Sequence, residues 1–94
     1  MRAAPALQWS PASGCEGSVL FLHQMEVLVH RHPAAPHIWC LTALEAGYDL
    51  LELKAQSELG AQHEALVLLQ KVLHRRLQGV KRVLQGSSQL VFPL

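Results

Sequence analysis

A chain of 94 residues has room for one domain, and leucine, valine and alanine supply most of its apolar half, with only 5% aromatic residues. A net charge of +1 excludes a strong overall attraction to nucleic acid or to an anionic membrane. No apolar run approaches the roughly 20 residues of a membrane-spanning helix. Two cysteines are too few for a disulfide framework, so we expect free thiols and a cytoplasmic location.

The N-terminal third of the chain is predicted to hold a flexible arm and one short helix. Residues 1–17 carry Ala, Pro, Ser and Gly without periodicity, as flexible segments do. Ser18 is suited to cap a helix over residues 18–32, which Pro33 ends. One face of this helix would hold Phe21, Met25 and Leu28. The same apolar residues also fit a buried strand, and the sequence leaves this alternative open.

Two longer helices are predicted to follow. The first begins at Ile38, and its apolar positions step by three and four residues: Leu41, Leu44, Tyr48, Leu51 and Ala55. Gly60 supplies the left-handed residue that commonly ends a helix. The second runs from about Gln62 to Gln85, with the most regular apolar spacing in the chain: Leu66, Leu69, Leu73, Leu77, Val80 and Leu84. So short a turn between two amphipathic helices implies an antiparallel hairpin.

The predicted fold is therefore all-α. An antiparallel helical hairpin over roughly residues 38–85 would form its core, with a third, shorter N-terminal helix and flexible ends. The chain would divide into an arm (1–17), a single helical domain (18–86) and a short apolar tail (87–94).

Charge is distributed unevenly along the chain. All seven acids lie at or before Glu64, and the segment after it holds only bases: Lys71, Arg75, Arg76, Lys81 and Arg82. In the predicted hairpin, an acidic face of Glu45, Asp49 and Glu52 would lie beside the basic helix, which accounts for the asymmetry without a ligand. The functional interpretation is that the five bases bind a partner. No aromatic residue is interleaved with them, which disfavours single-stranded nucleic acid.

The candidates for chemistry are few. His30, His32, His37 and Cys40 fall within eleven residues, and a spacing of three between two ligands is one that zinc sites use. Zinc sites commonly use several cysteine thiolates, and this group contains only one. The simpler interpretation is that these are polar residues at a helix end and in a loop, and a zinc site remains the alternative. The sequence shows no nucleophile with an orienting base and no glycine-rich phosphate loop. We therefore expect neither catalysis nor a cofactor.

One segment resembles known helical families. In Gly60–Val72, a glycine lies five residues before the small Ala65, and Leu69 follows. This arrangement resembles the turn and second helix of a tetratricopeptide repeat. Extended to Lys81, the segment also resembles the middle helix of a microtubule-interacting-and-trafficking domain. The resemblance covers residues 46–81, and either family implies a helical hairpin that binds a peptide or a partner helix in a groove.

From these observations we predict a non-catalytic helical protein–protein interaction module, either part of a larger assembly or a fragment of a longer helical protein. The alternative is a basic helix that binds anionic lipid or nucleic acid through residues 71–82. A protein partner or self-association is favoured over nucleic acid and over a small-molecule substrate.

Overall fold

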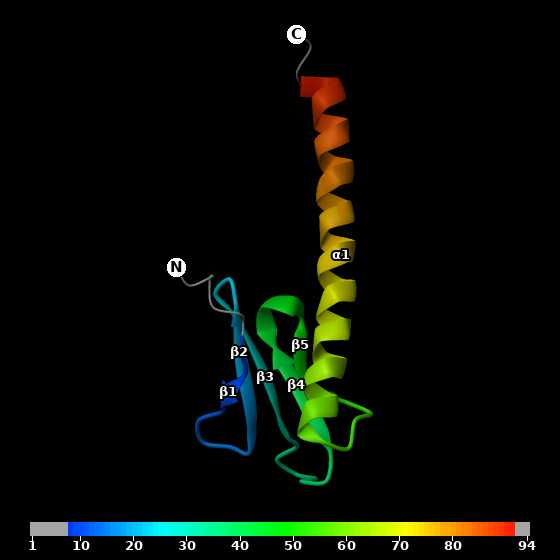
Figure 1. Cartoon of the computed structure of the whole chain (residues 1–94). Coiled ribbons are helices and arrows are strands. Elements are labelled where there is room, and N and C mark those ends of the chain that lie inside the picture. Colours follow the sequence, from blue (N-terminus) through cyan, green and yellow to red (C-terminus); the bar gives the residue numbers. More distant parts are fainter. Residues whose placement is uncertain (1–7, 92–94) are drawn as a thin grey trace, which may run out of the picture.

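A five-stranded antiparallel sheet followed by one long helix makes up the fold (Figure 1). The computed structural model describes residues 8–91, and the side chains of residues 8–86. The strands are β1 (Ser10–Pro11), β2 (Gly17–Leu22), β3 (Met25–Arg31), β4 (Trp39–Ala43) and β5 (Tyr48–Glu52). A 3-10 turn, η1 (Leu44–Ala46), precedes β5, and the helix is α1 (Glu58–Val91). Because the strands lie side by side in sequence order, the sheet is an antiparallel meander.

The fold is thus α+β, and the prediction of an all-α helical hairpin is wrong. Residues 18–32 form most of the β2–β3 hairpin, which corresponds to the buried-strand alternative. His23 and Gln24 join these two strands with φ values of 48° and 72°, as the two-residue turns of tight hairpins require. Leu20 is buried whereas its neighbour Phe21 is exposed, which is the alternation of a strand with one covered face.

The predicted helix from Ile38 is also absent, because its residues form β4, η1 and β5. Strand β4 is buried on both of its faces, as its residues Trp39, Cys40, Leu41 and Ala43 show. A strand covered on both sides loses the alternation of apolar and polar residues that identifies a strand in a sequence. Gly47, with a φ of 87°, ends η1 in the left-handed conformation and turns the chain into β5. The helical spacing over this segment was therefore a coincidence.

Helix α1 covers the segment predicted as the last helix but begins earlier. The Ser57 hydroxyl accepts a hydrogen bond of 3.1 Å from the backbone N–H of Gly60, which is the bond made by an N-cap serine. Gly60 therefore lies in the first turn of a helix rather than at the end of one. The Glu64 carboxylate accepts a hydrogen bond of 2.9 Å from the backbone N–H of Lys54, which ties the preceding loop to the helix.

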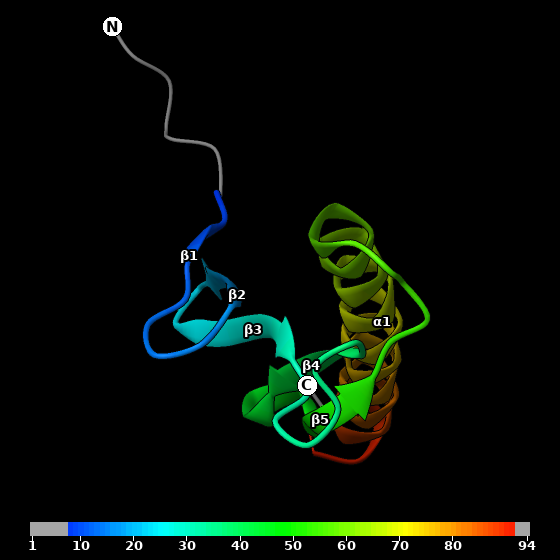
Figure 2. The same cartoon turned by 90° about the horizontal axis from the view of Figure 1, so that it is seen from below.

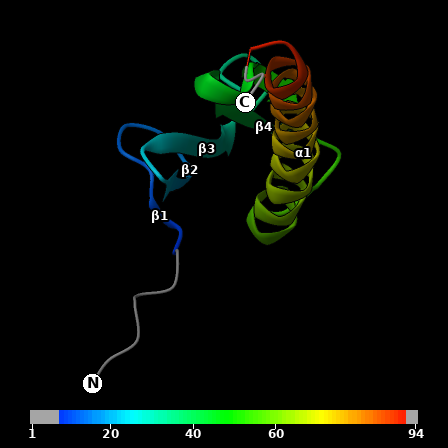
Figure 3. The ribbon, with the colours of Figure 1, turned by 90° about the horizontal axis from the view of Figure 1, so that it is seen from above.

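The core lies between one face of the sheet and the first half of α1. Figures 2 and 3 show the helix on one side of the sheet. Among the α1 side chains that the structure describes, Ala61, Ala65 and Leu69 are buried, and the two alanines allow the helix to approach the strands closely. They pack in one cluster with Leu20, Val27, Val29, Trp39, Leu41, Ala43, Ala46 and Leu53.

The ends of the chain differ from the predicted arm and tail. Residues 1–7 of the predicted arm lie outside the described residues, whereas Ser10–Pro11 pair with β2 at the edge of the sheet. At the other end, α1 continues through most of the predicted tail to Val91, and residues 92–94 lie outside the described part.

Candidate functional site

The second half of α1 extends well beyond the sheet (Figure 1). Its 34 residues give a helix about 51 Å long at 1.5 Å per residue. The longest strand, β3, has seven residues and spans only about 23 Å. Among the side chains described up to residue 86, the hydrogen bond furthest along α1 that joins it to the sheet half runs from the Arg76 guanidinium to the Glu45 carbonyl oxygen, at 2.7 Å. Leu77 still lines a hollow with Leu22 at the end of β2, and the helix then continues to Val91.

Large apolar side chains are exposed on α1 from Leu73 onward. Their exposed fractions run from 43% to 68%, and we call them the projecting stripe: Leu73, Leu77, Val80, Val83 and Leu84. At 100° per residue they fall within about a third of the circumference of the helix, so they form one continuous surface. Val80, Val83 and Leu84 line a shallow apolar hollow together with Arg76 and Gly79.

The five predicted partner-binding residues, Lys71, Arg75, Arg76, Lys81 and Arg82, all lie on α1 and are exposed. They are divided between two sides of the helix. By helical geometry, Arg76 and Lys81 border the projecting stripe, whereas Lys71, Arg75 and Arg82 lie opposite to it.

The acidic face predicted to lie beside these bases does not exist. Its residues Glu45, Asp49 and Glu52 belong to η1 and β5 rather than to a helix. Within the described side chains, the one ion pair joins Glu16 to Arg31 at 3.3 Å, both in the sheet half. The charge asymmetry is therefore not explained by pairing of α1 with a second helix.

The residues considered as zinc ligands do not converge. His30 and Cys40 are cross-strand neighbours on β3 and β4, while His32 and His37 lie in the connection between those strands. The ring nitrogens of His30 lie 2.9 Å from the Arg31 carbonyl oxygen and 2.9 Å from the Thr42 hydroxyl, so both are engaged. Across residues 8–91, no group of three His, Cys, Asp or Glu side chains could hold a metal ion.

The two cysteines have opposite environments: Cys15 is exposed and Cys40 is buried. Burial raises the pKa of the Cys40 thiol, and the nearby Glu52 carboxylate raises it further. The folded chain therefore holds the Cys40 proton more tightly than the unfolded chain does. This preference contributes stability below the ordinary thiol pKa, and the contribution is lost as the pH rises through the raised pKa.

We expect iodoacetamide at pH 8 to modify Cys15 rapidly and Cys40 only after unfolding, because the thiolate is the reacting species and Cys40 is both protonated and covered. Mass spectrometry of the alkylated chain in native buffer and in urea measures this. The Cys15→Ser variant serves as the control and should show no fast modification. Equal rates at the two cysteines in native buffer would contradict the buried position of β4.

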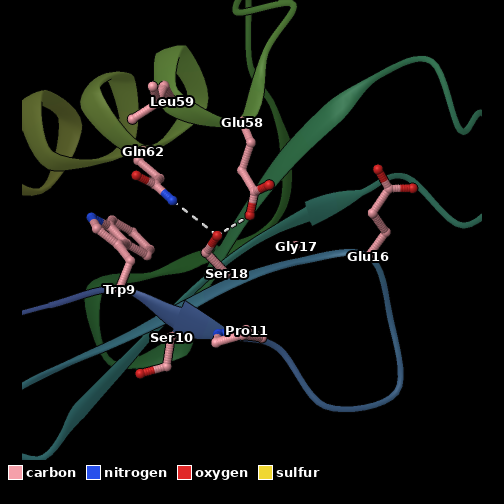
Figure 4. Close-up of a pocket in the computed structure, with 9 residues that line it drawn as sticks. All are labelled: Trp9, Ser10, Pro11, Glu16, Gly17, Ser18, Glu58, Leu59 and Gln62. Atoms are coloured by element: carbon pink, nitrogen blue, oxygen red, sulfur yellow. Dashed lines mark hydrogen bonds between the residues drawn. The ribbon is translucent and has the colours of Figure 1, made fainter.

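A polar pocket lies at the opposite end of α1, between the start of the helix and the first two strands (Figure 4). The Ser18 hydroxyl donates a hydrogen bond to the Glu58 carboxylate and accepts one of 2.9 Å from the Gln62 amide. Trp9 lies beside these groups, whereas Glu16 points away from them (Figure 4). Ser18 is only 4% exposed, and no histidine lines the pocket. These bonds hold the first turn of α1 on β2, which is a structural role.

The sequence identified most residues of the projecting stripe as one apolar helix face, but it predicted that this face would be buried inside a helical hairpin. The apolar spacing of a helix is the same whether the partner surface lies within the chain or outside it, so spacing alone could not separate the two cases. Comparison with known proteins gives no match to a family model, a curated protein or a solved structure. Among the described residues, no helix is both long enough and apolar enough to cross a membrane.

Proposed function

We propose that the chain is a non-catalytic protein-interaction module that binds its partner through the projecting stripe of α1. The observation that carries this proposal is the exposure of five large apolar side chains on one side of α1, four of which follow Arg76, the residue that bonds to the sheet half. Contiguous apolar surface of this kind typically marks an interaction site, because its contact with water is unfavourable. Free cysteines fit an intracellular setting, and we place the module in the cytoplasm.

The expected strength of such binding follows from the stripe itself. Full burial of one Leu or Val side chain contributes about 1.5–3 kcal/mol. The entropy lost when two partners associate offsets much of the free energy gained by burying these side chains. A contact built on this stripe alone would therefore be of moderate affinity. Arg76 and Lys81, which border the stripe, would then set the orientation of a partner that carries acidic groups.

A second candidate function is binding to an anionic lipid surface or nucleic acid through Lys71, Arg75, Arg76, Lys81 and Arg82, because all five bases are exposed on one helix. A flat membrane that covered the projecting stripe would leave Lys71, Arg75 and Arg82 facing away from the lipid headgroups, since they lie on the other side of the helix. This division favours a protein partner.

The proposal predicts that the double variant Leu77→Gln, Val80→Gln binds a hydrophobic fluorescent dye much more weakly than the wild-type chain, because both side chains are half exposed. The matched control is Val67→Gln, whose side chain is also exposed on α1 but lies on the other side of the helix. Dye fluorescence in a titration measures the effect, and circular dichroism confirms that each variant is folded. If the double variant binds the dye as strongly as the control variant does, the proposal is refuted.

A further inference from the structure

A second exposed apolar surface lies on the face of the sheet that α1 does not cover. Ser18 and Leu20 of β2 are buried, and Ser18 bonds to Gln62 of the helix, so these side chains face α1. Because side chains alternate along a strand, Val19 and Phe21 point to the other face. In the register of β2 and β3 their partners are Leu28 and Glu26.

These four residues form what we call the open sheet face. Phe21, near the turn of the β2–β3 hairpin, is 59% exposed, which is unusual for a phenylalanine within a strand. The four residues line a hollow of about 380 Å³ with Pro11, Ala12 and Ser13, and Glu26 is the only charged residue in its lining. The open sheet face is therefore apolar and bears a carboxylate.

The charges of the two halves of the chain are complementary. Residues 1–64 hold all seven acids and only Arg2, Arg31 and Lys54 as bases, a formal charge of −4, whereas residues 65–94 carry +5. On the sheet half, the exposed carboxylate of Glu26 belongs to the open sheet face itself, whereas Glu45, Asp49 and Glu52 lie in η1 and β5, toward the other edge of the sheet. One molecule thus displays an acidic apolar surface at one end and a basic apolar surface at the other.

We propose that the projecting stripe of one copy docks on the open sheet face of a second copy, head to tail. This inference rests on the proposed function and names the partner as another copy of this chain. The stripe cannot reach the open sheet face of its own chain, because α1 packs on the opposite side of the sheet and then runs away from it (Figures 1 and 2). The contact must therefore form between molecules.

Charge favours this arrangement over a contact between two stripes. No acid follows Glu64, so a second stripe offers no carboxylate to Arg76 or Lys81. The open sheet face offers Glu26 at the edge of its apolar hollow. A head-to-tail contact uses different surfaces on the two copies, so it leaves one surface free at each end and allows open-ended growth.

The first experiment is sedimentation velocity of the full chain over a range of concentrations and at two salt concentrations. The average mass should rise continuously with concentration and should fall at high salt, because salt screens the attraction between the charged ends. The variant Glu26→Lys and the variant Lys81→Glu should each weaken association, and their combination in one chain should restore it.

The decisive experiment mixes two variants that each lack one surface. The head variant is Phe21→Thr, which keeps a strand-forming residue, and the tail variant is Leu77→Gln, Val80→Gln. Each alone should associate about tenfold more weakly or worse, the effect of losing one well-buried apolar side chain. An equal mixture should form a closed 1:1 complex, because the intact stripe of the head variant meets the intact sheet face of the tail variant. Circular dichroism confirms that both variants are folded.

Each other outcome overturns the inference. A Phe21→Thr variant that associates as strongly as the wild-type chain would indicate contact between two stripes, which refutes head-to-tail docking and leaves the proposed function standing. A mixture that stays monomeric while the wild-type chain associates would also refute head-to-tail docking. A wild-type chain that is monomeric at all concentrations but binds vesicles containing phosphatidylserine would identify a lipid surface as the partner. A monomeric chain that still binds the hydrophobic dye through Leu77 and Val80 would likewise refute only the docking of a second copy.

Discussion

Replacing Leu69 with alanine is expected to lower the free energy of unfolding by about 2–5 kcal/mol, whereas the same change at Leu77 should alter it by less than about 0.5 kcal/mol. Leu69 is 2% exposed in the cluster between helix and sheet, and its truncation leaves a cavity there. Leu77 is 50% exposed and lines an open hollow with Leu22, so its truncation leaves no closed cavity. Urea titrations followed by circular dichroism, at a concentration low enough to keep the chain monomeric, measure both changes.

This pair of variants separates the observed fold from the predicted helical hairpin. Both leucines belong to the same regularly spaced set on one helix, and in a hairpin both would lie in the core. A loss at Leu77 as large as the loss at Leu69 would therefore show that the projecting stripe is covered within the chain, and it would remove the basis of the proposed function.

Replacing Gly17 with alanine is expected to lower the free energy of unfolding by about 1–3 kcal/mol or more. A Cβ at this position would lie 2.1 Å from the Val29 carbonyl oxygen and 2.8 Å from the His30 Cα, both in the backbone of the neighbouring strand. Backbone atoms cannot rotate away as the end of a side chain can, so β2 and β3 would have to separate where the hairpin begins. Thermal unfolding should show a decrease in Tm of several degrees.

Gly79→Ala is the matched control and should shift stability in the opposite direction. A Cβ at Gly79 would meet nothing within 4 Å, and the residue lies inside α1. Alanine there should stabilise the helix by about 0.5–1 kcal/mol, because it loses less backbone entropy on folding than glycine does. If Gly17→Ala did not lower the free energy of unfolding, just as Gly79→Ala is expected not to, the close approach of β2 to β3 at Gly17 would be contradicted.

Of the fold, the last helix could be predicted from the sequence and the sheet could not. The regular spacing from Leu66 to Leu84 is a local signal that survives in any tertiary context, because one helix repeats every 3.6 residues wherever it packs. Ser57 is also a recognisable N-cap signal, and giving it weight would have moved the predicted start of the helix close to Glu58. The strands carried weaker signals, because apolar residues on both faces of β4 hid its alternation.

The candidate site was predictable in part, for the same reason. The separation of charge along the chain and the two-sided character of α1 are properties of residue order alone, and both are found in the structure. Only the tertiary structure decided that residues 18–32 pair as strands and that Leu69 is buried while Leu77 is exposed. Spacing describes one element at a time, whereas burial depends on how far the neighbouring element extends. Here the strands are less than half as long as the helix, so the helix continues past them with its apolar side uncovered.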